Sequence, residues 1–314
     1  MDPSCSKALR SIGVTDQEYS AYEQWQLDKV YQQADNFDVI HIHMGHAALP
    51  YANFISTSIV HTLHGIFTAP IEQLFVQNRH QNYVSISDAQ RRPELGLNYV
   101  ATVYNGIDTS LFEFRAQPNH PSYLAFLGRF SPEKGPHLAI EIAKQAGWPL
   151  KMAGKVDPVD QVFFEQTVKP LLDGQQIEYL GEVDHAQKCD LMAGAMATLF
   201  PITWREPFGL VMAESMACGA PVIAMALGAA PEVIIHGETG FLCRTIDECV
   251  AAIAHIPTLD RQSCRAHVEE NFSVQRMVND YEAVYRQILA KHCAQADKWR
   301  SSAPYPANAQ SYLH

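Results

Sequence analysis

Short apolar runs alternate with helix-length stretches along most of this 314-residue chain. Short apolar strands separated by helices are typical of parallel sheets with crossover connections, so the sequence predicts an α/β protein. The first series of runs is FDVIHIH (37–43), SIVHTLHG (58–65), NYVSISD (82–88) and VATVYNGID (100–108). The second series is YLAFLGR (123–129), PLKMAGKV (149–156), IEYLGEV (177–183), ATLFP (197–201), APVIAM (220–225) and GFLC (240–243).

The two series of strands predict two domains. The chain length favours about two domains, and 47% hydrophobic residues are enough for two cores. A Pro/Asn/His-rich segment, 117–122, lies between the two series and has the composition of a linker. We therefore expect a Rossmann-like domain over 1–115, a second over 116–291, and a loose C-terminal tail over 292–314.

Charge and cysteine usage narrow the class of protein. With 23 Lys and Arg against 34 Asp and Glu, the net charge is -11, which disfavours bulk binding to nucleic acid or anionic membranes. The seven cysteines are an odd number without a CxxC pair, as expected for reduced thiols. No apolar run is long enough to span a bilayer, and the first residues do not resemble a leader. We expect a cytoplasmic protein without an integral membrane segment.

One loop and helix after a strand form a candidate anion site. The pattern predicts a strand over 197–201, a loop, and a helix whose first turn accepts Pro207. The amides of Gly209 and Leu210 would then lie at the positive end of the helix dipole. Such a position favours a phosphate group.

Two glutamates flank this predicted helix start. A rise of about 1.5 Å per residue separates the carboxylates of Glu206 and Glu214 by roughly 9 to 12 Å. Each carboxylate accepts hydrogen bonds, so each could hold a hydroxyl-rich ring at one end of a diphosphate. Spacing alone leaves a second interpretation open, in which Glu206 ends a loop and Glu214 is a solvated helix residue.

A second loop carries two cations. In LGRFSPEKG, Arg129 ends a strand and Lys134 follows five residues later, around a Ser-Pro turn. A planar guanidinium and a mobile ammonium on one loop suit a diphosphate. The sequence of this loop by itself is equally consistent with two exposed basic residues that bind no ligand.

Five histidines lie close together in the first half of the chain. Their spacing raises the possibility of a zinc site, because two of them share a strand face. The alternative is that polar side chains at the ends of parallel strands contact a small ligand, as they often do near a cleft. We expect no metal here. The five are His41, His43, His46, His61 and His64.

The segment 197–225 closely resembles the E-x7-E region of family 4 glycosyltransferases, which are retaining enzymes with two facing Rossmann-like domains, the GT-B fold. The resemblance covers roughly 123–290 and, in the first domain, begins at about Phe37. Family members normally start with a strand and a glycine-rich loop upstream of the segment that matches FDVIHIH. That opening is absent, so we expect an incomplete N-terminal domain and a possible partner chain that supplies it.

The resemblance implies roles for the candidate residues. In the family, the first Glu of the motif meets the transferred sugar and the second binds the ribose hydroxyls, which places these roles on Glu206 and Glu214. Arg129 and Lys134 would stabilise the departing nucleoside diphosphate without a metal, and His64 would approach the transferred sugar. The remaining expected donor contacts are Gly154, Lys155, Val183, Phe208, Gly209 and Leu210.

The expected function is retaining transfer of a sugar from a UDP-sugar or GDP-mannose type donor to a hydroxyl acceptor, without metal or cofactor. The leading alternative is a non-catalytic nucleotide-sugar-binding subunit or half of a split enzyme. An epimerase or phosphorylase of the same fold is a further alternative. A nicotinamide oxidoreductase is disfavoured because no G-x-G-x-x-G follows a strand. The acceptor stays open among a polysaccharide precursor, a lipid-linked sugar and a small metabolite.

Overall fold

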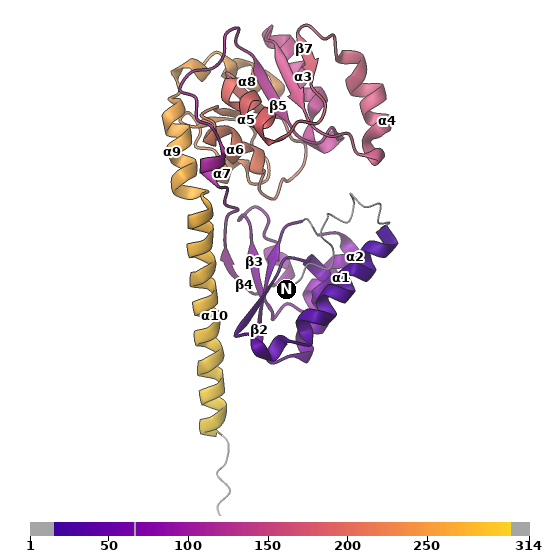
Figure 1. The fold of residues 1–314 in the computed structure, drawn as a ribbon, viewed down its shortest axis with the longest axis vertical. Coiled ribbons are helices and arrows are strands. Elements are labelled where there is room, and N and C mark those ends of the chain that lie inside the picture. The colour runs from indigo at the N-terminus through magenta and orange to yellow at the C-terminus, as the bar shows by residue number, and fades with distance from the viewer. Residues whose placement is uncertain (1–15, 66, 303–314) are drawn as a thin grey trace, which may run out of the picture.

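The computed structural model describes residues 16–65 and 67–302, which form two α/β domains (Figure 1). In the N-terminal domain, the four parallel strands lie in the order β1-β2-β3-β4. Their bounds are β1 Val39–Ile42, β2 Ser58–Leu63, β3 Asn82–Ser85 and β4 Tyr99–Thr102, and the helices of this domain are α1 Asp16–Tyr31 and α2 Ala69–Gln77.

The C-terminal domain contains a six-stranded parallel sheet in the order β10-β9-β8-β5-β6-β7. The order reverses between β5 and β8, so the loops that leave these two strands diverge and open a crevice at their carboxyl ends. The strands are β5 Leu124–Leu127, β6 Leu150–Ala153, β7 Ile177–Tyr179, β8 Ala197–Phe200, β9 Val222–Met225 and β10 Gly240–Cys243. The helices are α3 Pro136–Ala146, α4 Gln161–Phe163, α5 His185–Gly194, α6 Leu210–Ala217, α7 Ala230–Val233, α8 Ile246–Ile253 and α9 Arg261–Asn271.

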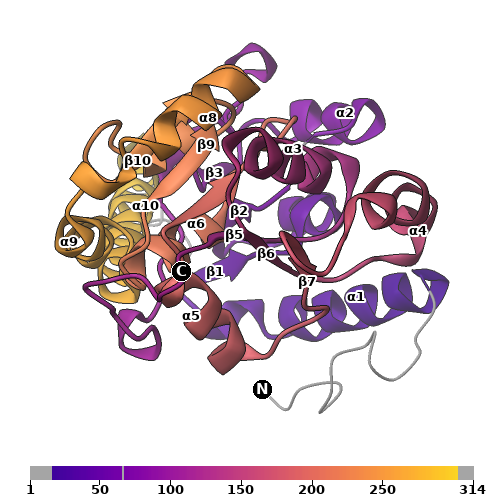
Figure 2. The same cartoon turned by 90° about the horizontal axis from the view of Figure 1, so that it is seen from above.

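Both faces of this second sheet are buried. Side chains of β9 alternate between two hydrophobic clusters, because successive residues of a strand point to opposite faces. Val222 and Ala224 join the cluster that contains α6 and α9, whereas Ile223 joins the cluster that contains α3 and α8. Figure 2 shows the helices around the sheet. Each large side chain buried this way stabilises the fold by about 1.5–3 kcal/mol.

The C-terminal helix crosses back to the first domain. Helix α10, Val274–Ser302, follows α9 and runs along the N-terminal sheet (Figure 1). Its Tyr281, Val284 and Ile288 pack against Val60 and Val84 of that sheet. The expected loose tail over 292–314 is therefore wrong for 292–302, which are helical, and 303–314 lie outside the described residues. The apolar side chains of α10 pack against the first domain, although the position of this helix in the sequence suggested that it belongs to the second domain.

The chain passes between the domains twice at one place. Ile107 donates its N–H to the carbonyl of Phe272 (2.8 Å), and Val274 donates to the carbonyl of Ile107 (3.1 Å). Gly106 is required here, because a Cβ at this position would lie 2.6 Å from the carbonyl oxygen of Ser273.

The described residues also bear on the other expectations from composition. Among them, no helix has both the length and the apolarity needed to cross a membrane. Five cysteines are free and buried, namely Cys189, Cys218, Cys243, Cys249 and Cys264. The ten strands coincide with the ten apolar runs predicted from the sequence, which confirms the α/β fold.

Candidate functional site

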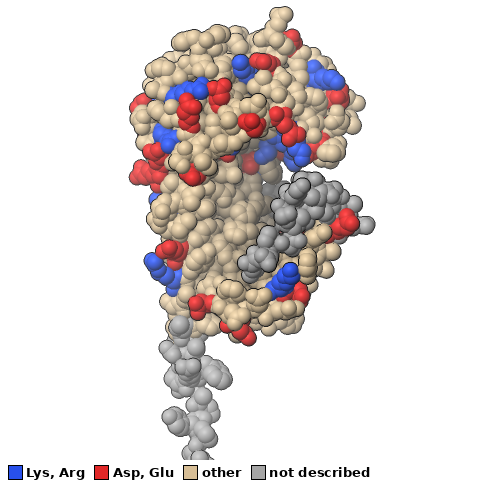
Figure 3. All heavy atoms as spheres, in the orientation of Figure 1, with Lys and Arg blue, Asp and Glu red and all other residues tan. Residues whose placement is uncertain are grey.

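A cavity of about 400 Å³ lies between the domains, at the carboxyl ends of β5 and β8. Figure 3 shows the hollow between the domains, with basic side chains on its C-terminal-domain rim. Seven of the predicted site residues line this cavity: His64, Arg129, Lys134, Glu206, Phe208, Gly209 and Leu210. The other lining residues are Gly65, Ile86, Asn105, Trp204 and Pro207.

Glu206 lies in the loop between β8 and α6 and is 8% exposed. Its Oε2 accepts hydrogen bonds from Lys134 Nζ (2.5 Å) and Trp204 Nε1 (2.8 Å). A carboxylate this buried requires such partners, because an unpaired charge would be strongly destabilising. The cation and the indole therefore fix the orientation of Glu206.

The helix start differs from the sequence prediction. Helix α6 begins at Leu210, so Pro207 precedes it and does not occupy its first turn. Gly209 ends the loop with φ +84°, and a Cβ there would lie 2.7 Å from the Cε of Met212. Gly209 thus permits a sharp turn that places the N-terminal end of α6 against the cavity, where the helix dipole favours an anion.

Glu214 is not among the residues that line this cavity. It is the fifth residue of α6, and its Oε1 accepts a hydrogen bond from Lys188 Nζ of α5 (2.7 Å). The structure therefore separates the two glutamates into different surroundings. The ribose contact of Glu214 stays a prediction.

The two cations come from the loop after β5. Gly135 has φ +72°, and a Cβ there would lie 2.1 Å from the carbonyl oxygen of Pro201. This close approach brings Lys134 next to Glu206 across the switch point between β5 and β8. Arg129 forms ion pairs with Glu133, with Asp157 (3.7 Å) and with Asp160 (3.5 Å). Both cations thus carry acidic partners that a bound diphosphate would have to replace or share.

Three of the expected donor contacts, Gly154, Lys155 and Val183, lie in the loops after β6 and β7. Gly154 follows β6 with φ +146°, and a Cβ there would lie 1.8 Å from the carbonyl oxygen of Gly128. Lys155 forms an ion pair with Asp157, and Val183 packs against the cluster next to β5. Gly154, Lys155 and Val183 are not among the lining residues, so their part in donor binding stays a prediction.

The rings of three histidines, His41, His43 and His64, lie next to one another at β1 and β2. His43 Nδ1 lies 2.8 Å from His64 Nε2, while His41 contacts Tyr285 Oη and Thr62 Oγ1, both at 2.7 Å. Burial, with a smaller contribution from His43, lowers the pKa of His41 to about 3. Burial also lowers the pKa of His64 and of His43, so the rings are neutral near pH 7.

Across 16–65 and 67–302, no cluster of three or more His, Cys, Asp or Glu could hold a metal ion. The ring nitrogens of His41 instead contact hydroxyl groups.

Two features were not predicted from the sequence. Trp204 stands two residues before Glu206, so an aromatic next to the acidic motif was the available signal. A second cavity of about 350 Å³ shares His64 and Gly65 with the first. Its remaining lining residues are Tyr19, Tyr22, Glu23, Gln26, His43, Met44 and Gly45.

The chain belongs to the family glycosyl transferases group 1, whose model matches residues 108–271. It is 26% identical over 276 residues to glycogen synthase of Mycobacterium tuberculosis (strain CDC 1551 / Oshkosh), covering 78% of this chain and 65% of that protein. It is 35% identical over 132 residues to N-acetyl-alpha-D-glucosaminyl L-malate synthase of Bacillus anthracis, covering 40% of this chain and 34% of that protein. The chain thus spans about 65% of the glycogen synthase and about a third of the malate synthase.

Solved structures show the same fold. Sucrose-phosphate synthase from Thermosynechococcus elongatus superposes with a TM-score of 0.74 at 20% identity, covering 88% of this chain and 81% of the other. AviGT4, a glycosyltransferase involved in avilamycin A biosynthesis, superposes with a TM-score of 0.66 at 23% identity, covering 84% and 78%. The two facing parallel-sheet domains are accordingly a GT-B fold.

Proposed function

We propose that this protein transfers a sugar from a nucleoside diphosphate sugar to a hydroxyl acceptor. The observation that carries this proposal is the convergence of Glu206, Lys134 and Arg129 with His64 around one interdomain cavity. Two cations and the N-terminal end of α6 provide positive charge for a diphosphate. The donor would be of the UDP-sugar or GDP-mannose type.

In the proposed reaction, the bond between the anomeric carbon and the β-phosphate oxygen breaks. The acceptor oxygen forms its new bond to the anomeric carbon on the same face of the sugar, and its proton passes to the leaving phosphate. Arg129 and Lys134 stabilise the charge that develops on the diphosphate. Glu206 supports the positive charge that develops on the sugar, and His64 contacts the sugar from the other domain.

Metal independence is part of the proposal. It is supported by the position of Arg129 and Lys134, which bring cationic groups to the cavity where a divalent ion would otherwise neutralise the diphosphate. Turnover should therefore persist in EDTA. Loss of all activity on chelation, restored by one divalent ion, would contradict this part.

The test is a transfer assay with purified protein, a panel of nucleotide sugars and simple hydroxyl acceptors. The proposal predicts release of nucleoside diphosphate and a product whose anomeric configuration, measured by NMR, matches that of the donor. Glu206→Ala should lower turnover far more than it changes nucleotide affinity, whereas Arg129→Ala should lower both. Wild-type activity in either variant, or a product of inverted configuration, would refute the proposed mechanism. Nucleotide binding without transfer would instead favour a non-catalytic nucleotide-sugar-binding subunit or half of a split enzyme.

A further inference from the structure

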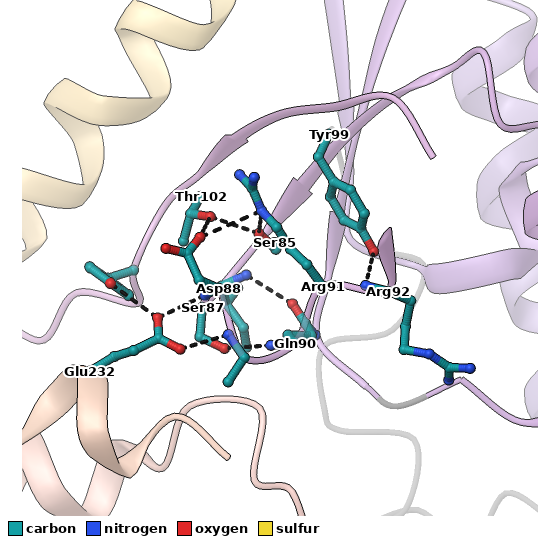
Figure 4. Close-up of polar contacts among 12 residues, drawn as sticks. Ser85, Ser87, Asp88, Gln90, Arg91, Arg92, Tyr99, Thr102 and Glu232 are labelled. Carbon is teal, nitrogen blue, oxygen red and sulfur yellow. Dashed lines mark hydrogen bonds and ion pairs between the residues drawn. The ribbon is translucent and has the colours of Figure 1, made fainter. Parts of the chain in front are cut away.

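One carboxylate of the C-terminal domain holds a turn of the N-terminal domain (Figure 4). Glu232 of α7 accepts the N–H of Asp88 on Oε2 (2.7 Å) and the N–H of Ala89 on Oε1 (2.6 Å). Tyr104 Oη donates a third hydrogen bond to Oε2 (3.1 Å). Because each oxygen binds its own N–H, the carboxylate fits only one relative placement of α7 and this turn.

A second contact holds the same turn. Arg205 donates from its guanidinium to the carbonyl of Ala89 (2.9 Å), and Arg205 directly precedes Glu206 in the chain. The turn from Ser87 to Gln90 is also restrained internally, since the N–H of Gln90 donates to Ser87 Oγ (3.0 Å). The C-terminal domain thus binds a preformed turn at both its amide and carbonyl groups.

This turn also holds the segment that carries His64. The side chain of Gln90 is buried, and its Nε2 donates to the carbonyls of Leu63 (2.9 Å) and Gly65 (3.1 Å), the two neighbours of His64. Its Oε1 accepts the N–H of Ile86 (2.9 Å). The amide nitrogen of Gln90 therefore holds the backbone on both sides of His64, while its amide oxygen is anchored by Ile86.

On the other side, α7 is fixed to the loop of Glu206. Ala229, the residue before α7, donates its N–H to the carbonyl of Glu206 (2.9 Å). A Cβ at Gly228 would lie 2.4 Å from the backbone N of Glu206, so the two segments are in close backbone contact. Glu232 and Glu206 consequently belong to one packed unit.

We propose that Glu232 is a positioning residue that sets His64 opposite Glu206 by gripping the turn at Asp88 and Ala89. The inference rests on the proposed sugar transfer, in which both side chains contact the sugar. A continuous series of contacts, here called the path, links the two side chains. It runs from the Glu206 loop through α7 and Glu232 to the turn, and from Gln90 of the turn to the backbone around His64. Separation of the domains releases Glu232 from the turn, so closure and the placement of His64 are coupled.

The test compares Glu232→Gln with the matched control Glu238→Gln, which makes the same charge change at an exposed position six residues later. The glutamine retains one acceptor oxygen but turns an NH₂ group toward a backbone N–H. We expect kcat to fall about tenfold, the size of effect expected for one charge-assisted hydrogen bond, while the KM for the donor changes less than threefold. Amide hydrogen exchange should accelerate at 88–89 and also at 63–65. The control should match the wild type in all three measurements.

A double-mutant cycle with Gln90→Ala tests the path itself. If Glu232 acts through Gln90, the double variant should lose no more kcat than the more impaired single variant. Strictly additive losses, or faster exchange at 88–89 with unchanged exchange at 63–65 and unchanged kcat, would overturn the inference. A melting scan of each variant verifies folding. If no donor supports turnover in the wild type, the proposed function fails, and the exchange data still decide whether Glu232 fixes the segment around His64.

Discussion

Glu206→Gln is the substitution for which the structure makes the least obvious prediction. The ammonium of Lys134 lies 2.5 Å from Glu206 Oε2, although we propose that the same ammonium binds the diphosphate. Binding of a nucleotide therefore competes with this ion pair. A neutral glutamine of nearly the same shape would release Lys134 while it removes the charge that supports the sugar.

The expected change in nucleotide affinity follows from the burial of the ion pair between Lys134 and Glu206. The side chains of Lys134 and Glu206 are 23% and 11% exposed. Breaking a fully buried pair costs about 3–5 kcal/mol, and an exposed pair contributes about 1 kcal/mol or less. Trp204 continues to donate to Glu206 when Lys134 leaves, so we take about 1.5 kcal/mol for the competition, equivalent to about a tenfold change in Kd.

Glu206→Gln should therefore bind the nucleoside diphosphate up to about tenfold more tightly and turn over at least about a hundredfold more slowly. Isothermal titration calorimetry gives the Kd, and steady-state kinetics give kcat. Glu141→Gln, on the exposed side of α3, is the matched control and should change neither quantity. Weaker nucleotide binding in Glu206→Gln would show that the pair does not compete with the diphosphate, and a wild-type kcat would show that the charge of Glu206 does not support the sugar.

Three further predictions concern other parts of the fold. His43→Ala should lower kcat about two- to fivefold through loss of the hydrogen bond to His64, and His46→Ala, its control, should leave kcat unchanged. Burial lowers the pKa of His61 to about 4, so the unfolded chain binds a proton at this residue more readily than the folded chain does. As the pH is lowered from about 6.5, the free energy of unfolding measured by urea titration should therefore decrease by up to about 1.4 kcal/mol per pH unit. His61→Gln should reduce that slope. Arg261 donates to three backbone carbonyls, so Arg261→Met should lower the free energy of unfolding by about 3 kcal/mol, and an unchanged melting temperature would contradict this.

The sequence predicted the strands well because each is short, apolar and bounded by turn residues. In β8 and β9 nearly every side chain is buried, so burial on both faces produces a continuous apolar run. The sheet against which α10 packs could not be predicted in the same way. Its apolar spacing indicates a buried stripe, but spacing does not say which sheet the stripe covers.

The family resemblance implied one donor site for Arg129 and Glu206. Both residues line one cavity at the carboxyl ends of β5 and β8, which agrees with the rule that ligands of such sheets bind at the point where the strand order reverses. The ion pair between Lys134 and Glu206 could not be predicted, because it depends on the close packing of Gly135 against Pro201. The role of Glu232 was also hidden, since its partners Asp88 and Ala89 contribute backbone amides that leave no signature in the sequence.

The central claim is that the interdomain cavity binds a nucleoside diphosphate, and thermal stabilisation by a panel of UDP, GDP and ADP compounds and their sugars, without added metal, tests it most directly. The account predicts that one nucleotide raises the melting temperature selectively. It also predicts that this response is lost in an Arg129→Ala/Glu214→Ala double variant. No response to any nucleotide in the folded protein, or an equal response in the double variant, would contradict it.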